Sequence, residues 1–154
     1  MPLVAVVMGS KSDTEALKPT LEALNQLGID YEVNVISAHR TPEKARQFGI
    51  SAREKGFEVI IAAAGGAAHL PGVLASWTTL PVIGIPLASS ELKGVDALYS
   101  IVQMPSGIPV ACVAVGSAGA KNAAFLAAEI LGLKHKSIRD AYDKFRKDLQ
   151  GEYK

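Results

Sequence analysis

Five short, mostly apolar stretches recur along the chain, and small or polar residues follow four of them. They lie at 3–8, 31–36, 58–64, 81–86 and 110–115. Apolar runs of this length are typical of strands that are buried on both faces of a parallel sheet. The pattern therefore predicts a sheet of five strands.

The segment after the first strand carries leucines at helical spacing and ends at a glycine, which predicts a helix. These residues are Leu17, Leu21, Leu24, Leu27 and Gly28. Ser12 and Glu15 fit a capping box at the start. Pro19 conflicts with that start, because proline removes a backbone donor and crowds the preceding turn. We therefore expect the helix either to kink at Pro19 or to become regular only near Lys18.

Further helices are predicted at 42–55, 73–77, 95–101 and 136–149, and from the glycine-rich turn 116–121 through 131. Strands that alternate with helices through short connections build a parallel sheet covered on both faces. We therefore expect one domain over residues 1–154, with a three-layer α/β/α flavodoxin-like sheet and an extra C-terminal helix. That helix lies outside the repeat, and we expect it to pack on a neighbouring subunit.

Composition and charge narrow the class of protein. The chain has 154 residues, of which 49% are hydrophobic and 20% charged, as in a globular domain with a full core. The formal net charge of +1 gives no long-range attraction to nucleic acid or to a membrane surface. No secretory signal precedes the first strand, and no apolar run approaches the ~20 residues of a membrane span. We expect a cytoplasmic protein.

Several chemically distinctive residues have ordinary interpretations. The single cysteine, Cys112, falls in the fifth strand, which predicts a buried thiol rather than a nucleophile. His135 stands between two lysines, which predicts a solvated face. Trp77 is expected in the core or at an interface, and Asp96 and Tyr99 are expected on the surface.

The turn 37–42, with the sequence SAHRTP, joins the second strand to the second helix. Ligands of open α/β sheets bind at such turns, at the carboxyl ends of the strands. His39 can move a proton near neutral pH, and Arg40 can hold a phosphate or a carboxylate. A capped helix start with a surface arginine explains the same residues, so the turn alone leaves both interpretations open.

Small or polar residues follow four of the strands, at Gly9-Ser10, Ser37-Ala38, Gly65-Gly66 and Gly116-Ser117. Because the carboxyl ends of parallel strands share one edge, these turns predict a single concave, backbone-rich pocket. Such turns need glycine and serine in any case. That explanation accounts less well for the presence on the same edge of Asp13, His39, Arg40 and His69.

Residues 10–13 offer free amides and two hydroxyls at a helix start, which suits a phosphate. They match neither a Walker loop nor a dinucleotide fingerprint, and a plain helix cap is the alternative interpretation. Asp13 either accepts from sugar hydroxyls or caps the helix. His39 and His69 lack a metal-ligand spacing to any Cys, Asp or Glu, so no metal is expected. No ATP loop or biotin attachment sequence is visible, so carboxyl chemistry in this chain would use neither.

Four motifs together resemble the bacterial N5-carboxyaminoimidazole ribonucleotide mutases of purine biosynthesis. They are VMGSKSD at 7–13, SAHRTP at 37–42, AGGAAHLPG at 64–72 and GVDALYSIVQMP at 94–105. The resemblance spans nearly the whole chain and implies a flavodoxin-like homo-octamer without a cofactor. It implies a ribonucleotide substrate whose carboxylate moves from the exocyclic nitrogen to ring carbon C4, through release and recapture of CO2.

The resemblance also implies a role for each residue of these motifs. Ser10 and Arg40 would hold the phosphate with help from Ser12, Asp13 would bind the ribose, and His39 would be the general acid and base. The other substrate-binding residues that it implies are Ser37, Ala38, Gly65, Gly66, Ala67 and His69. The backbone of 65–67 and His69 would surround the base and the migrating carboxylate, and the irregular segment 87–109 or a neighbouring subunit would seal the pocket.

Two other functions stay open. The first is direct carboxylation of aminoimidazole ribonucleotide with CO2. Animal relatives that carboxylate in this way typically carry a lysine-glycine pair after the active-site histidine, and Arg40-Thr41 at that place favours the mutase. The second is a non-catalytic flavodoxin-like module that binds FMN or a nucleotide. Aromatic residues are only 6% of the chain, which counts against it.

Overall fold

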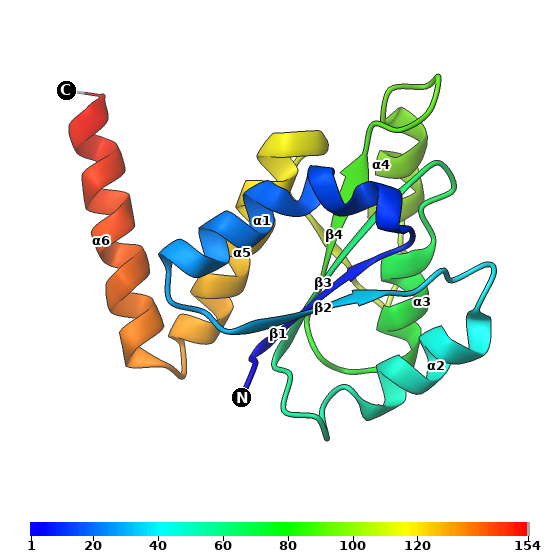
Figure 1. Ribbon diagram of the computed structural model, residues 1–154, viewed down its shortest axis with the longest axis horizontal. Helices are drawn as coiled ribbons and strands as arrows, with labels where there is room; N and C mark the ends of the chain where they lie inside the picture. The colour runs from blue at the N-terminus through cyan, green and yellow to red at the C-terminus, as the bar shows by residue number, and fades with distance from the viewer. Residues whose placement is uncertain (154) are drawn as a thin grey trace.

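The computed structural model describes residues 1–153, in which five parallel strands form one sheet with the order β2-β1-β3-β4-β5 (Figure 1). The strands are β1 (Val4–Met8), β2 (Tyr31–Val35), β3 (Val59–Gly65), β4 (Val82–Leu87) and β5 (Ala111–Cys112). This order, with helices on both faces, is that of flavodoxin-like sheets. The prediction of a three-layer flavodoxin-like fold is confirmed.

Helices follow each strand. They are the short 3-10 helix Lys11–Asp13, α1 (Thr14–Gln26), α2 (Pro42–Ser51), α3 (Leu70–Trp77), α4 (Val95–Val102), α5 (Gly116–Gly132) and α6 (Lys136–Glu152). The helices α1 and α5 cover one face of the sheet, and α2, α3 and α4 cover the other. The last helix, α6, packs along α5 at the outer side of the first layer (Figure 1).

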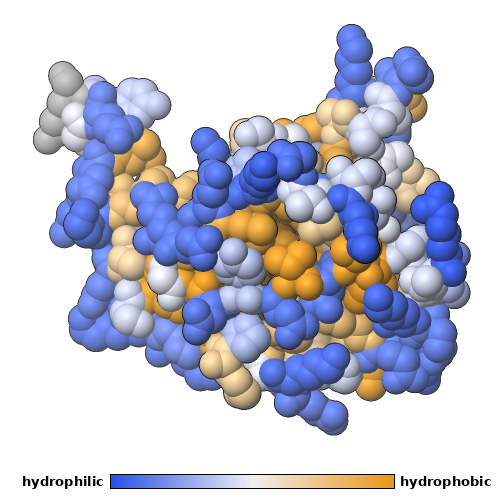
Figure 2. Space-filling model, in the orientation of Figure 1, coloured by the Kyte–Doolittle hydropathy of each residue, from blue (hydrophilic) through white to orange (hydrophobic). Residues whose placement is uncertain are grey.

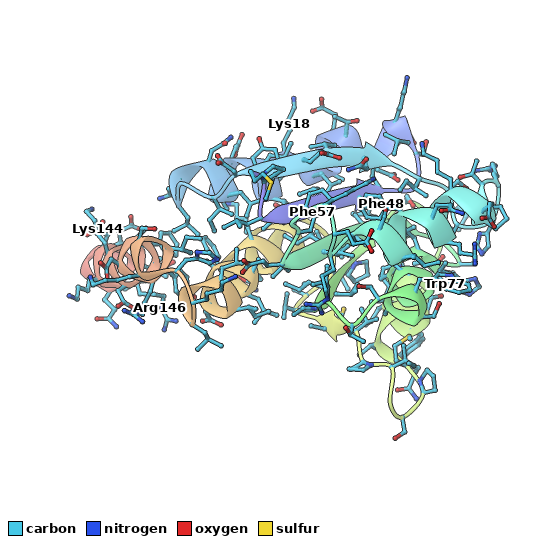
Figure 3. The ribbon with its side chains drawn as sticks, turned by 90° about the horizontal axis from the view of Figure 1, so that it is seen from below. Lys18, Phe48, Phe57, Trp77, Lys144 and Arg146 are labelled. Atoms are coloured by element: carbon cyan, nitrogen blue, oxygen red, sulfur yellow. The ribbon has the colours of Figure 1, made fainter. Side chains whose placement is uncertain are left out.

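The central strand β1 contributes to both layers, and all five of its residues are buried. Its first, third and fifth side chains face α1 and α5, whereas its second and fourth face the layer of α2, α3 and α4. In this second layer Phe48 of α2 lies beside Phe57, with ring centroids 6.0 Å apart (Figure 3). Alternation along one strand therefore joins two separate apolar cores.

The fifth strand is much shorter than predicted. Only Ala111 and Cys112 pair with β4, although the apolar run continues to residue 115. The chain leaves the sheet at Ala114, whose φ of 144° is rare for a residue with a side chain. The predicted turn 116–121 is already the first part of α5. Within it, a Cβ at Gly119 would lie 2.1 Å from the Ala114 carbonyl oxygen, so only glycine fits there. Glycine at this position lets the helix begin directly against the strand end.

The start of the first helix also differs from the prediction. Ser12 does not cap it; instead Ser10 caps the 3-10 helix by accepting from the Ser12 N–H at 3.3 Å. The helix α1 runs unbroken from Thr14 with Pro19 inside it. Proline in the second turn removes only the hydrogen bond to the carbonyl of Glu15, and the buried face of the helix holds the rest in place.

Other helix ends shift by a few residues. The helix α2 ends at residue 51 rather than 55, α3 begins at 70 rather than 73, α4 ends at 102 rather than 101, and α6 extends to 152. Pro71 stands in the first turn of α3, a position that needs no backbone donor, so this helix begins earlier than the irregular sequence suggested. Within residues 1–153, no helix has the length and apolar character of a membrane span.

His135 does not lie on a solvated face. Its Nε2 lies 3.0 Å from a Glu58 carboxylate oxygen, and the Lys134 ammonium donates to the other oxygen at 2.6 Å. The prediction failed because Glu58, 77 residues away in sequence, meets the α5–α6 connection only in the folded chain. The Lys134 hydrogen bond, followed by that of His135, lowers the pKa of Glu58.

The remaining distinctive residues largely follow their ordinary interpretations. Cys112 is a half-buried strand thiol, and burial raises its pKa. Trp77 does not lie in the core, because it is 42% exposed at the end of α3, where the Arg46 guanidinium lies 5.1 Å from its ring centroid. Asp96 and Tyr99 lie on the outer side of α4, where Asp96 accepts a hydrogen bond from the Ser90 hydroxyl at 2.5 Å.

Candidate active site

A pocket of about 190 Å³ opens at the carboxyl edge of the sheet. The segments that follow β1, β2, β3 and β4 all contribute to it. Its lining residues are Gly9, Ser10, Asp13, Ser37, Ala38, His39, Arg40, Ala64, Gly65, Ala67, His69, Leu70 and Ser89. The predicted pocket is therefore present, and it combines segments that are up to 80 residues apart.

The structure brings most of the predicted site residues together in this pocket. Two of them, Ser12 and Gly66, are adjacent to lining residues without lining it themselves. The Ser12 hydroxyl donates to Ser10 Oγ at 2.9 Å and so lies behind Ser10. The turn Gly116-Ser117 does not contribute, contrary to prediction. The strand order places β5 at the far edge of the sheet, two positions from β3.

Two histidines face each other in the pocket. His39 Nε2 lies 2.8 Å from His69 Nδ1, with the ring planes at 85°. One nitrogen must donate and the other accept, since a neutral imidazole offers one of each. The pair joins the turn after β2 to the turn after β3. Sequence analysis placed both residues on one edge but did not predict their direct contact.

The turn before α2 is held by its own hydrogen bonds. Ser37 Oγ accepts from the Arg40 backbone N–H at 3.2 Å, and the Thr41 hydroxyl donates to the Ser37 carbonyl at 2.8 Å. Lys44, in the first turn of α2, donates to the Val35 carbonyl at 2.9 Å. The backbone of this turn therefore presents His39 in a fixed direction, as a site for proton transfer requires.

Arg40 and the segment after β1 form the end of the pocket that suits an anion. Within residues 1–153, the Arg40 guanidinium has no ion-pair or hydrogen-bond partner, and the side chain is exposed. Ser10 is half-buried and lines the same pocket. A free guanidinium and a serine hydroxyl that line one pocket are suited to bind a phosphate together.

Asp13 completes this end of the pocket. Burial raises the pKa of its carboxyl group, and a hydrogen bond with the backbone of Ser10 partly offsets that effect. Asp13 occupies the N-cap position of α1, but its carboxylate does not cap the helix. Beyond its hydrogen bond with the Ser10 backbone, the carboxylate can still accept from a ligand.

The other end of the pocket is built by the segments after β3 and β4. Sequence analysis missed three residues here, Ala64, Leu70 and Ser89. A Cβ built on Gly65 would lie 1.8 Å from Ser89 Oγ, so the serine hydroxyl lies directly over the glycine. Ser89 follows β4 by two residues, and the rule that placed the other turns at this edge would have found it.

Comparison with known proteins extends these observations. A family model described as AIR carboxylase matches residues 3–152. A Saccharolobus solfataricus protein named N5-carboxyaminoimidazole ribonucleotide mutase is 58% identical over 152 residues, which cover 99% of this chain and 95% of the relative. A Pseudomonas aeruginosa protein of that name is 58% identical over 144 residues, covering 94% and 88%. The crystal structure of Treponema denticola PurE matches with a TM-score of 0.88 and 31% identity, covering 99% of this chain and 94% of that one.

Proposed function

The chain belongs to the AIR carboxylase family, and we infer that it is a mutase that converts N5-carboxyaminoimidazole ribonucleotide to 4-carboxyaminoimidazole ribonucleotide. Curated relatives that bear this activity as their name are 51–59% identical over most of the chain. In the structure, the feature that carries the mechanism is the 2.8 Å contact between His39 and His69 in a pocket with a free arginine.

The substrate fits the pocket with its phosphate at the end formed after β1 and β2. Arg40 and Ser10 supply the donors for the phosphate oxygens, with Ser12 supporting Ser10 through its hydroxyl. Asp13 accepts from the ribose hydroxyls. The aminoimidazole ring then extends toward Gly65, Ala67 and the two histidines, along the backbone that follows β3.

The reaction needs two proton transfers in opposite directions. His39 donates a proton to the exocyclic nitrogen, the N–C bond to the carboxyl group breaks, and CO2 leaves. Ring carbon C4 attacks this CO2, and His39 removes the C4 proton as the aromatic ring is restored. An imidazole suits both steps because it titrates near neutral pH. The hydrogen bond between His39 and His69 holds the His39 ring in place between the two steps.

Substrate choice distinguishes the mutase from direct carboxylation. The protein is supplied either with N5-carboxyaminoimidazole ribonucleotide or with aminoimidazole ribonucleotide and bicarbonate, both without ATP. Formation of the C4 carboxylate is then followed. We expect rapid conversion of the first substrate only. Product formation from the second substrate at a comparable rate would instead identify a carboxylase.

We also propose that the enzyme is a cytoplasmic homo-octamer in which α6 packs on a neighbouring subunit. A groove between α1, α5 and α6 supports this, because Phe125, Tyr142, Phe145 and Leu149 line it. Figure 2 shows this side of the molecule hollowed beside α6. Sedimentation at about 130 kDa, eight copies of a 16.2 kDa chain, is the expected result, and a 16.2 kDa species would contradict it.

A further inference from the structure

We propose that Ser89 is a further substrate-contacting residue, whose hydroxyl donates a hydrogen bond to the carboxyl group before transfer and to CO2 during transfer. The inference rests on the mutase function. It concerns a residue outside the motifs that point to that function, in the segment that follows β4.

The position of Ser89 in the pocket is the first argument. In the sheet order, the strands that precede Arg40, Ser10 and Asp13 are β2 and β1. Gly65 and Ser89 follow β3 and β4, farther along the same edge. A ribonucleotide with its phosphate at the first end therefore places its base, and the carboxyl group on the base, at the end that Ser89 lines.

The second argument is that the Ser89 hydroxyl is free. Within residues 1–153 it has no hydrogen-bond partner. It lies over Gly65, and a side chain at position 65 would displace the Ser89 hydroxyl. The adjacent Ser90 differs, because its hydroxyl donates to Asp96 at 2.5 Å and accepts from the Leu92 N–H at 3.2 Å. Ser90 therefore holds the segment in place, whereas the hydroxyl of Ser89 is available to bind a ligand.

The chemistry of the migrating group explains why a hydroxyl is useful here. A carboxylate and CO2 both present oxygen atoms that only accept hydrogen bonds. Ser89 can donate to one of these oxygens on both sides of the N–C bond cleavage, while Gly65 keeps the space beside it clear. A donor that follows the group through both states keeps CO2 near C4, and this lowers the chance of its escape.

The test compares Ser89→Ala with the parent and with Ser90→Ala. Each protein receives N5-carboxyaminoimidazole ribonucleotide. The C4-carboxylated product and free aminoimidazole ribonucleotide are quantified against an enzyme-free blank. For Ser89→Ala we expect a kcat about tenfold lower and a raised KM, because the hydroxyl also contacts the carboxyl group before transfer. We also expect a severalfold larger fraction of decarboxylated nucleotide per turnover. Ser89→Thr keeps the hydroxyl and should restore the parent fraction.

The outcomes separate this inference from the proposed function. If the parent converts the substrate but Ser89→Ala retains its kcat and decarboxylated fraction, the inference about Ser89 alone is overturned. If Ser90→Ala shows the same increased loss of CO2, the effect comes from the loop and the inference is also overturned. If the parent makes no C4 carboxylate, the mutase function falls, and the role of Ser89 falls with it.

Discussion

Histidines at the two ends of the sheet have different kinds of partner. At the carboxyl end, His39 and His69 are exposed and face each other. At the opposite end, just before β3, Glu58 holds His135 in a partly buried position. A carboxylate can only accept, so its imidazole partner is kept as a fixed donor. An imidazole partner can donate or accept, so a proton can pass through the pair.

This difference separates a residue used for chemistry from one used for assembly of the fold. The Glu58 carboxylate receives hydrogen bonds from both Lys134 and His135, which fixes the α5–α6 connection against the start of β3. The pocket histidines fix nothing comparable, because turns that are already hydrogen-bonded carry them. Substitutions at the two ends should therefore change different measured quantities.

Loss of the imidazole of His39 should have the largest effect. His39→Asn removes the acid and base but keeps a polar side chain, so we expect kcat to fall by about a thousandfold while ligand affinity changes little. His135→Asn is the matched control and should keep the parent kcat. Steady-state kinetics and calorimetric titration with the product nucleotide measure both quantities. A kcat within tenfold of the parent for His39→Asn would refute its role.

Arg40 tests the anion-binding end of the pocket. Arg40→Met removes a charged donor from the phosphate, and we expect KM to rise by about 10- to 100-fold with a smaller change in kcat. Arg46→Met, at a position within α2 that contacts Glu43 and Trp77, is the control and should keep the parent KM. Equal KM values for the two variants would place the phosphate elsewhere.

His69 tests whether the histidine pair acts as a unit. His69→Asn removes the partner of His39 Nε2, and we expect kcat to fall by about three- to tenfold, the scale of one neutral hydrogen bond. The pH dependence of kcat should change as well, because the proton of His39 is no longer shared. An unchanged kcat and pH profile would show that the 2.8 Å contact has no part in the reaction.

Glu58 should affect stability alone. Its pKa is lowered in the folded protein from the ordinary 4.5, so the unfolded chain takes up a proton there at higher pH. The stabilisation is present above that value and is lost as the pH falls through the lowered pKa. Glu58→Gln should reduce the free energy of unfolding at pH 7 by about 1 kcal/mol and leave kcat unchanged.

Urea denaturation between pH 7 and pH 3 measures this effect. The stability difference between the parent and Glu58→Gln should shrink toward acid pH, whereas exposed Glu54, substituted in the same way, should show no difference at either end. A constant difference across the range would mean that packing, and not the charge of Glu58, links α6 to the sheet.

Much of this arrangement could be predicted from local patterns. Apolar runs locate the strands, and glycine and serine after them locate the turns, because both signals are carried by neighbouring residues. The fold class and the gathering of Ser10, Asp13, His39, Arg40 and His69 at one edge followed from these signals alone. The part of the site that can be predicted from the sequence is the part formed by the turns that directly follow the strands.

The features that were missed depend on contacts that exist only in the folded chain. His135 meets a carboxylate 77 residues away, and no pattern around its two neighbouring lysines indicates this. The early end of β5 depends on the approach of Gly119 to the Ala114 carbonyl, which apolar character cannot show. The place of Ser89 at this edge could have been predicted from the end of β4, but its close approach to Gly65 exists only in the folded chain.

The alternation of faces along β1 also restricts how this protein can vary in length. Gly9 and Ser10 follow Met8 directly, so the strand sets both the allocation of side chains to the two cores and the reach of the anion-binding turn. One residue inserted into Val4–Met8 would invert both cores and advance the turn by about 3.3 Å. The length of α6 can therefore vary, whereas β1 tolerates substitutions of its side chains but no insertion or deletion.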